Sequence, residues 1–197
     1  MKNIAHFLFE IGMLKRTPRS GFQFLGSGDE SVAEHSFRTA IVGYTLAQMD
    51  GGVDIGKVLE LCLFHDVPEA RTGDMNYVNK KYVTVDEARA VEDLARTLPF
   101  GDRYRQLLTE LDDRASAEAR IAHDADQLDM ILSLKEHHDL GNRYAQQWYP
   151  YALQRLQTEA GRTLAETIWD TDSTHWWFDD DAEWWVRGKR LPPASGT

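Results

Sequence analysis

An apolar stretch at residues 55–64, followed at once by His65 and Asp66, constrains the fold of this 197-residue chain more than any other feature. Apolar residues occupy so many of its positions that a helix here would be buried on most of its surface. Pro68 discourages regular helix just beyond it. Burying two good divalent-metal ligands is costly unless they bind something, so the stretch predicts a core helix that presents a metal site. The alternative is a His-Asp pair satisfied by ordinary hydrogen bonds, as most isolated pairs are.

The composition indicates a globular protein with an acidic surface. The formal net charge of −10 argues against a general nucleic-acid binder and against an anionic membrane surface, whereas a small phosphate ester needs only a local basic spot. The single cysteine, Cys62, lies in the predicted core helix and cannot form an intrachain disulfide, and no stretch approaches the roughly 20 apolar residues of a membrane span. We therefore predict a cytoplasmic protein that binds neither nucleic acid nor membrane.

Helical periodicity and capping residues predict an all-α single domain, without strand alternation. Ser31 with Glu34 matches a capping box that starts a helix running toward Gly51, and Thr84 with Glu87 matches a second box. The predicted helices cover residues 4–14, 31–51, 55–64, 84–98, 101–113, 115–140, 143–159 and 164–169, with Asp54 as a further cap and an irregular loop at 69–79.

The C-terminal part of the chain differs from the rest in composition. Residues 176–185 combine four tryptophans with a run of acidic residues. Aromatic area of this kind favours docking over ligand binding. We predict a helical domain at residues 1–165 and a Trp-rich acidic extension at 166–197 that packs on the domain or on a dimer interface.

Candidate metal ligands occur on three of the predicted helices. His35 lies early in the second helix, and His65 and Asp66 lie at the end of the third. An acidic cluster on the long helix offers the fourth ligand: Asp124, Asp126 and Asp129. Two imidazoles with two carboxylates suit Mn, Fe, Co, Ni or Zn, with positions left open for water and substrate. Periodicity does not choose among the three aspartates.

The order of these residues carries a resemblance. His35, then His65-Asp66, then Asp126 resembles the H…HD…D signature of the HD superfamily of metal-dependent phosphohydrolases. Four blocks resemble more narrowly its 5′-deoxynucleotidase family: LKRTPRSGF at 14–22, SVAEHS at 31–36, HDVPEARTGD at 65–74 and DADQL at 124–128. The similarity runs from about residue 5 to 160, and four blocks in order at suitable spacing are specific.

This resemblance implies a single-domain HD-type helical bundle, usually a homodimer, which removes phosphate from deoxyribonucleoside 5′-monophosphates with one divalent ion. Carried over by matching position, the metal ligands are His35, His65, Asp66 and Asp126. The catalytic candidates are Glu69, for the proton of the attacking water, and Asp74, a second acid near the substrate. The substrate-binding candidates are Arg19, which matches a phosphate-holding arginine, Phe22 and Arg16.

One departure bears on the substrate. Some relatives place a tryptophan directly after the arginine that Arg19 matches, where this chain has Ser20, Gly21 and then Phe22. Either Phe22 replaces that ring or the specificity differs. The alternatives are an HD phosphohydrolase for another small phosphate ester or nucleotide and a non-catalytic nucleotide-binding regulator. Glu69 disfavours the regulator, because a pure binder has no need of a water-activating acid. The native metal, Mn, Co, Fe, Ni, Zn or Mg, is not fixed by the sequence.

Overall fold

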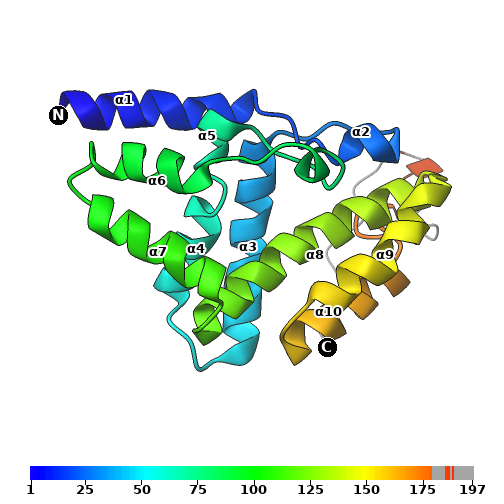
Figure 1. Ribbon diagram of the computed structural model, residues 1–197. Helices are drawn as coiled ribbons and strands as arrows, with labels where there is room; N and C mark the ends of the chain where they lie inside the picture. The colour runs from blue at the N-terminus through cyan, green and yellow to red at the C-terminus, as the bar shows by residue number, and fades with distance from the viewer. Residues whose placement is uncertain (179–184, 187, 189–197) are drawn as a thin grey trace.

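The computed structural model describes residues 1–178, 185–186 and 188, and this part of the chain is a helical bundle without a β-strand (Figure 1). A lone bridge between Pro18 and Ser31 is its one β-type pairing. The all-α prediction is confirmed. None of the described helices is both long and apolar enough to cross a membrane. The elements are α1 (Lys2–Ile11), η1 (Gly12–Lys15), α2 (Phe22–Leu25), α3 (Val32–Asp50), α4 (Ile55–Phe64), α5 (Glu69–Thr72), η2 (Asn79–Lys81), α6 (Glu87–Ala95), α7 (Gly101–Asp113), α8 (Ala117–Asp139), α9 (Arg143–Arg155) and α10 (Glu159–Asp170).

The long helix α8 is the centre of the bundle. It packs against α3, α4, α7, α9 and α10, and it runs diagonally between α3 and α9 in Figure 1. Its residues Ala125, Leu128 and Ile131 are fully buried in the main core. Close approach of α3 depends on Gly43, because a Cβ atom there would lie 2.5 Å from Sγ of Cys62 on α4. Helices α3, α4 and α8, which carry the candidate ligands, therefore meet closely.

Helix α4 is less buried than its apolar sequence predicts. Val58, Leu61 and Cys62 face the core, whereas Leu63 is 49% exposed. The prediction that this helix is buried on most of its surface is wrong, because α3, α7 and α8 cover one side of it and no described element covers the other. An apolar residue on a helix records a preference for burial, and neighbouring elements decide whether it is met.

Capping residues set the start of the ligand-bearing helices. Ser31 caps α3: its hydroxyl accepts from the backbone N–H of Glu34 at 3.2 Å, and the Glu34 carboxylate accepts from the backbone N–H of Ser31 at 2.8 Å. This capping box is confirmed, as is the cap of α4 by Asp54, which accepts from the backbone N–H of Lys57 at 3.1 Å. Because α3 begins at residue 32, His35 lies in its first turn.

Other predicted boundaries are wrong. Helix α6 begins at Glu87 and uses Asp86 as its cap, not Thr84, because aspartate caps as well as threonine and the two positions compete. Residues within the predicted loop at 69–79 form the short helices α5 and η2. Helix α9 ends at Arg155, earlier than predicted, and α10 begins at Glu159, also earlier than predicted.

The start of α10 is tied to the middle of α8. The buried Asp124 carboxylate accepts from the backbone N–H groups of Gln157 and Thr158, each at 2.8 Å, and from the Thr158 hydroxyl at 2.7 Å. A Cβ atom at Gly161 would lie 2.5 Å from Oδ2 of Asp124. Only a residue without a side chain leaves room for this cap, which ends α9 and starts a new helix.

We expect Gly161→Ala to destabilise the fold by about 1–3 kcal/mol, because four interactions hold the Asp124 carboxylate where the new methyl group would lie. Urea unfolding followed by circular dichroism measures the effect. The control is Gly12→Ala, where φ is −61° and nothing lies within 4 Å of the added Cβ. That change should be neutral or stabilising by up to about 1 kcal/mol. Equal stabilities of the two variants would show that the cap has room to relax.

The predicted division at residues 165 and 166 falls inside α10, which runs without interruption from Glu159 to Asp170. On this helix Trp169 stacks on Tyr149 of α9, with 4.0 Å between ring centroids, and Ala165 is fully buried. Much of the Trp-rich segment, residues 179–184, 187 and 189–197, lies outside the described residues. Its separate role as a docking extension stays a prediction.

Candidate metal centre

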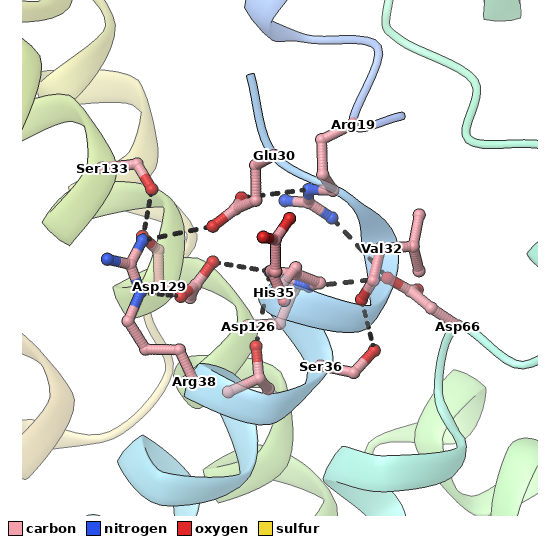
Figure 2. A network of polar contacts seen from close by, with 12 residues as sticks. Arg19, Glu30, Val32, His35, Ser36, Arg38, Asp66, Asp126, Asp129 and Ser133 are labelled. Atoms are coloured by element: carbon pink, nitrogen blue, oxygen red, sulfur yellow. Dashed lines mark hydrogen bonds and ion pairs between the residues drawn. The ribbon is translucent and has the colours of Figure 1, made fainter. Parts of the chain in front are cut away.

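Four side chains from three helices converge at one point. Nε2 of His35 lies 3.1 Å from Nε2 of His65, 3.2 Å from Oδ1 of Asp126 and 3.5 Å from Oδ2 of Asp66. His65 and Asp66 follow α4 directly, and Nε2 of His65 lies 3.1 Å from Oδ2 of Asp66. Figure 2 shows Asp66 and Asp126 on either side of His35. The structure thus brings together all four candidate ligands that the sequence pattern selects.

The two imidazoles present lone pairs to each other. Nδ1 of His35 donates to Oδ2 of Asp129 at 2.6 Å, and Nδ1 of His65 donates to the carbonyl oxygen of Cys62 at 2.7 Å. In the neutral tautomer that these bonds fix, the other ring nitrogen carries no hydrogen. Two bare Nε2 atoms therefore face each other beside two carboxylates. A cation between them turns this repulsion into coordination.

The spacing of the donor atoms fits a shared ion. Donors bound to one ion at about 2.0–2.2 Å lie roughly 3.0–3.5 Å from each other in tetrahedral or octahedral geometry. The measured separations of 3.1–3.5 Å fall in this range. In addition, Oδ2 of Asp66 is buried and accepts no hydrogen bond within the described residues. A mixed set of imidazole nitrogens and carboxylate oxygens suits a divalent transition metal.

The charges at the centre show the same demand for a cation. Burial disfavours a charged imidazole, yet the carboxylates of Asp66 and Asp126 outweigh burial and raise the pKa of His65 to about 9. Burial likewise opposes a charged Asp126, but the imidazoles of His35 and His65 hold the pKa of that carboxyl well below its usual range. The group of four therefore attracts positive charge, which a divalent ion supplies without protons.

A second layer of side chains holds His35 in place. Asp129, which is fully buried, accepts from His35 and also from Nε of Arg38 (Figure 2). Arg38 in turn donates to Ser133 and, at 2.9 Å, to Glu136. Sequence reasoning did not assign Asp129 this part. Its place three residues after Asp126, on the same side of α8, is a signal that could have identified it, because metal-binding histidines need such a carboxylate.

We expect Asp129→Asn to weaken metal retention about 10–100-fold while the protein stays folded, because an amide no longer enforces the tautomer that bares Nε2 of His35. Competition with a fluorescent chelator measures the affinity, and circular dichroism checks the fold. The matched control is Asp113→Asn, which changes an exposed aspartate at the end of α7. Unchanged affinity in the Asp129 variant would refute this role.

The three aspartates of α8 have three different surroundings. Asp124 faces α10 and caps it, Asp126 faces the two imidazoles, and Asp129 supports His35 from behind. The choice that periodicity leaves open is therefore made by the packing around α8.

A cleft of about 570 Å³ opens at the four donors. Its polar end includes the two candidate ligands Asp66 and Asp126 together with Arg19 and Glu69. Its other walls are largely apolar and aromatic: Phe22, Phe24, Met130, Leu134, Trp148, Tyr151 and Ala152. The sequence identified Trp148 and Tyr151 as packing aromatics, and no pattern distinguished them as cleft residues. A small ligand with one anionic end and one aromatic end suits this shape.

Glu69 is a carboxyl group without a partner at the polar end of the cleft. Its Oε2 atom is buried and makes no hydrogen bond within the described residues. Burial, together with the charges of Asp66 and Asp74, raises the pKa of Glu69 to about 9. A buried carboxyl that faces a cleft can exchange a proton with a group bound there.

Arg19 and Asp74 lie on the same side of the cleft. Nη1 of Arg19 lies 3.6 Å from Oδ2 of Asp66, and its Nε lies 3.9 Å from Glu30. Burial alone would lower the pKa of Arg19, but Asp126 and Asp66 keep it above its ordinary value, so the guanidinium stays charged. Asp74 accepts from the backbone N–H of Ser20 at 2.6 Å and from its hydroxyl at 3.2 Å. Asp74 therefore fixes the loop that carries Arg19.

The two remaining candidates have different positions. Phe22, on α2, lines the cleft and packs edge-to-face on His137, with 5.6 Å between ring centroids. Arg16 is exposed at the end of η1 and does not line the cleft, as far as the described residues define it. The structure therefore brings Arg19, Phe22, Glu69 and Asp74 to the site, and leaves Arg16 outside it.

Comparison with known proteins places this geometry in a family. The sequence model of the HD domain family, described as "HD domain", matches residues 11–169. The chain is 31% identical to 5′-deoxynucleotidase HDDC2 of Bos taurus over 148 residues, covering 72% of this chain and 71% of that protein. It is similar in structure to a conserved hypothetical protein of Pyrococcus furiosus, at 30% identity and a TM-score of 0.70, covering 84% of this chain and 97% of the other. A protein of Magnetospirillum magnetotacticum described as a predicted metal-dependent phosphohydrolase gives 26% identity and a TM-score of 0.69, covering 86% of this chain and 90% of the other.

The matched region contains all four converging donors and the helices that carry them. The family resemblance read from the sequence is confirmed at both the sequence and the structural level. This chain belongs to the HD domain family and is an HD phosphohydrolase.

Proposed function

We propose that the protein hydrolyses nucleoside 5′-monophosphates, preferably deoxyribonucleotides, to nucleoside and phosphate with one divalent transition metal ion. The observation that carries the proposal is the meeting of two imidazoles and two carboxylates at the polar end of a cleft with aromatic walls. The cleft volume of about 570 Å³ is within the range of small-molecule sites. The names of relatives such as the Bos taurus 5′-deoxynucleotidase support this substrate class.

His35, His65, Asp66 and Asp126 are the residues that would hold the metal. The order of their helices gives a mixed nitrogen and oxygen set, which suits Mn, Fe, Co, Ni or Zn better than Mg. A divalent ion bound there lowers the pKa of a coordinated water and offsets charge on phosphoryl oxygens.

Arg19 and Glu69 act on the substrate and on the attacking water. The guanidinium of Arg19, held near Asp66 and Glu30, offers a planar set of donors that matches phosphate oxygens. Glu69, whose Oε2 atom has no partner among the described residues, takes the proton of the attacking water and returns it to the leaving oxygen. Both side chains reach the cleft from segments next to the donors.

Asp74 and Phe22 have supporting roles in this proposal. Asp74 fixes Ser20 and so orients the neighbouring Arg19, which makes it a positioning residue. Phe22 and Trp148 offer ring faces to the sugar and base at the apolar end of the cleft. Homodimer formation and a cytoplasmic location stay predictions, and light scattering of the purified protein measures the first directly.

Phosphate release from a panel of deoxyribonucleoside and ribonucleoside 5′-monophosphates tests the function. The protein is stripped of metal and then supplied with Mn, Co, Fe, Ni, Zn or Mg in turn. We expect release with at least one transition metal and faster turnover of the deoxy substrates. Release from other phosphate esters alone would redirect the proposal to a different substrate, and no release with any metal would favour a non-catalytic nucleotide binder.

A further inference from the structure

A second cleft, of about 730 Å³, adjoins the metal centre and is lined mainly by polar side chains. Four of them are cations from separate parts of the chain: Lys80, Arg114, Arg155 and Arg162. Asp126 is the one carboxylate among its described lining residues. Because the whole chain has 32 acidic and 22 basic residues, a cleft of average composition would hold more acids than bases. This basic cleft is thus a local exception on an acidic protein.

The cations of the basic cleft are not neutralised by nearby carboxylates. Within the described part of the chain, none of the four forms an ion pair. Arg155 donates to the side-chain oxygen of Gln127 at 3.1 Å and lies 4.8 Å from the centroid of the Tyr77 ring. Arg162 donates to the carbonyl oxygen of Leu156 at 2.8 Å. These neutral partners orient the two guanidinium groups and leave their charge available to an anion.

The basic cleft and the metal-site cleft meet at the proposed metal ligand Asp126. Both are also lined by Tyr77, Lys80, Gln127 and Arg155, so the contact between Tyr77 and Arg155 stands where the two join. Asp126 keeps 28% of its side chain exposed there. The two clefts differ in chemistry, since one has aromatic walls and the other has cationic walls. An anion that begins at the metal centre can therefore continue into the basic cleft.

We propose that the basic cleft is an oligophosphate-binding site, which takes the phosphoryl groups beyond the first in a nucleoside 5′-polyphosphate or in inorganic tripolyphosphate. Guanidinium groups bind phosphate oxygens in pairs, and several cations along one cleft match a chain of phosphates better than a single phosphate. The inference rests on the proposed function in one respect, namely that the nucleoside occupies the aromatic cleft. Such an anion is either an extended substrate or an effector that blocks the monophosphate.

Calorimetric titration with inorganic tripolyphosphate tests the site without any turnover. The full-length protein is first dialysed against a chelator, so that the anion cannot act by removing metal. We expect saturable binding at low ionic strength that weakens as salt is added, because the contacts are ionic. This measurement separates the two proposals: binding stands or falls whether or not the metal-loaded protein releases phosphate from monophosphates.

Two double variants locate the binding. Arg114→Gln with Arg162→Gln removes two cations of the basic cleft and should weaken tripolyphosphate binding at least about tenfold. Lys15→Gln with Lys81→Gln removes the same charge from exposed residues that line neither cleft and should leave binding within about twofold. Arg114→Lys with Arg162→Lys keeps the charge and should retain most of the affinity. Absence of binding, or equal loss in the two glutamine variants, would overturn the proposal.

Deoxyribonucleoside triphosphates, with metal in excess, distinguish the two sources of oligophosphate. If they are hydrolysed, the KM should rise in Arg114→Gln with Arg162→Gln, and the site holds part of a substrate. If they inhibit monophosphate hydrolysis instead, the inhibition constant should rise in the same variant, and the site holds an effector. Turnover of monophosphates should be unchanged in either case. Triphosphates that neither react nor inhibit would count against the site.

Discussion

Asp66→Ala should abolish both metal retention and phosphatase activity, with turnover reduced by at least about 10³-fold. The expected loss exceeds the roughly 10–100-fold effect of a supporting residue, because Asp66 is one of the four donors themselves. Its Oδ2 atom lies within 3.1–3.5 Å of both imidazole nitrogens and accepts no hydrogen bond from described residues, so no structural bond is lost with it. Elemental analysis of the purified variant measures the metal, and phosphate release measures turnover.

The fold of the Asp66 variant can be controlled separately. Circular dichroism and urea unfolding should match the parent protein, since removal of one carboxylate also removes repulsion from Asp126 in the metal-free state. Asp66→Asn keeps the shape of the side chain and should lose metal as well. The exposed Asp113→Ala should retain metal and activity. A fully active Asp66 variant with normal metal content would show that the four donors do not hold the catalytic ion.

Glu69→Gln should retain the metal and lose at least about 10²-fold in rate. Glutamine keeps the volume of the side chain but cannot take a proton from water. Glu69 lines the cleft beside the donors, and its Oε2 atom has no hydrogen-bond partner in the described structure, so the change should leave the fold intact. Steady-state kinetics on a deoxyribonucleoside 5′-monophosphate, with metal analysis of the same sample, separates the two effects.

The control for Glu69 is Glu60→Gln, which alters a half-exposed glutamate that pairs with Arg103 on the surface. That variant should keep both metal and rate, because exposed ion pairs contribute little to stability. Normal turnover by Glu69→Gln would exclude its role in proton transfer. Loss of metal from Glu69→Gln would instead make Glu69 part of the metal centre.

Much of the site could be predicted because local sequence sets the positions of its residues along their helices. The capping box at Ser31 starts α3 at residue 32, which puts His35 in the first turn. Asp54 starts α4, which puts His65 at the helix end. These caps depend on a few consecutive residues, so no distant contact is needed to infer them. Where two residues compete to cap the same helix, as Thr84 and Asp86 do, local sequence does not decide between them.

The sequence by itself determined the all-α class, the order of the helices and the residue types that can bind a metal. Only the tertiary structure decided which aspartate of α8 faces the imidazoles. Successive residues on a helix point about 100° apart, so Asp124, Asp126 and Asp129 point in three directions, and neighbouring helices give each direction its surroundings. The same holds for the basic cleft, whose cations come from η2, α9, α10 and the end of α7. Their charge is written in the sequence, but their meeting depends on how the helices pack.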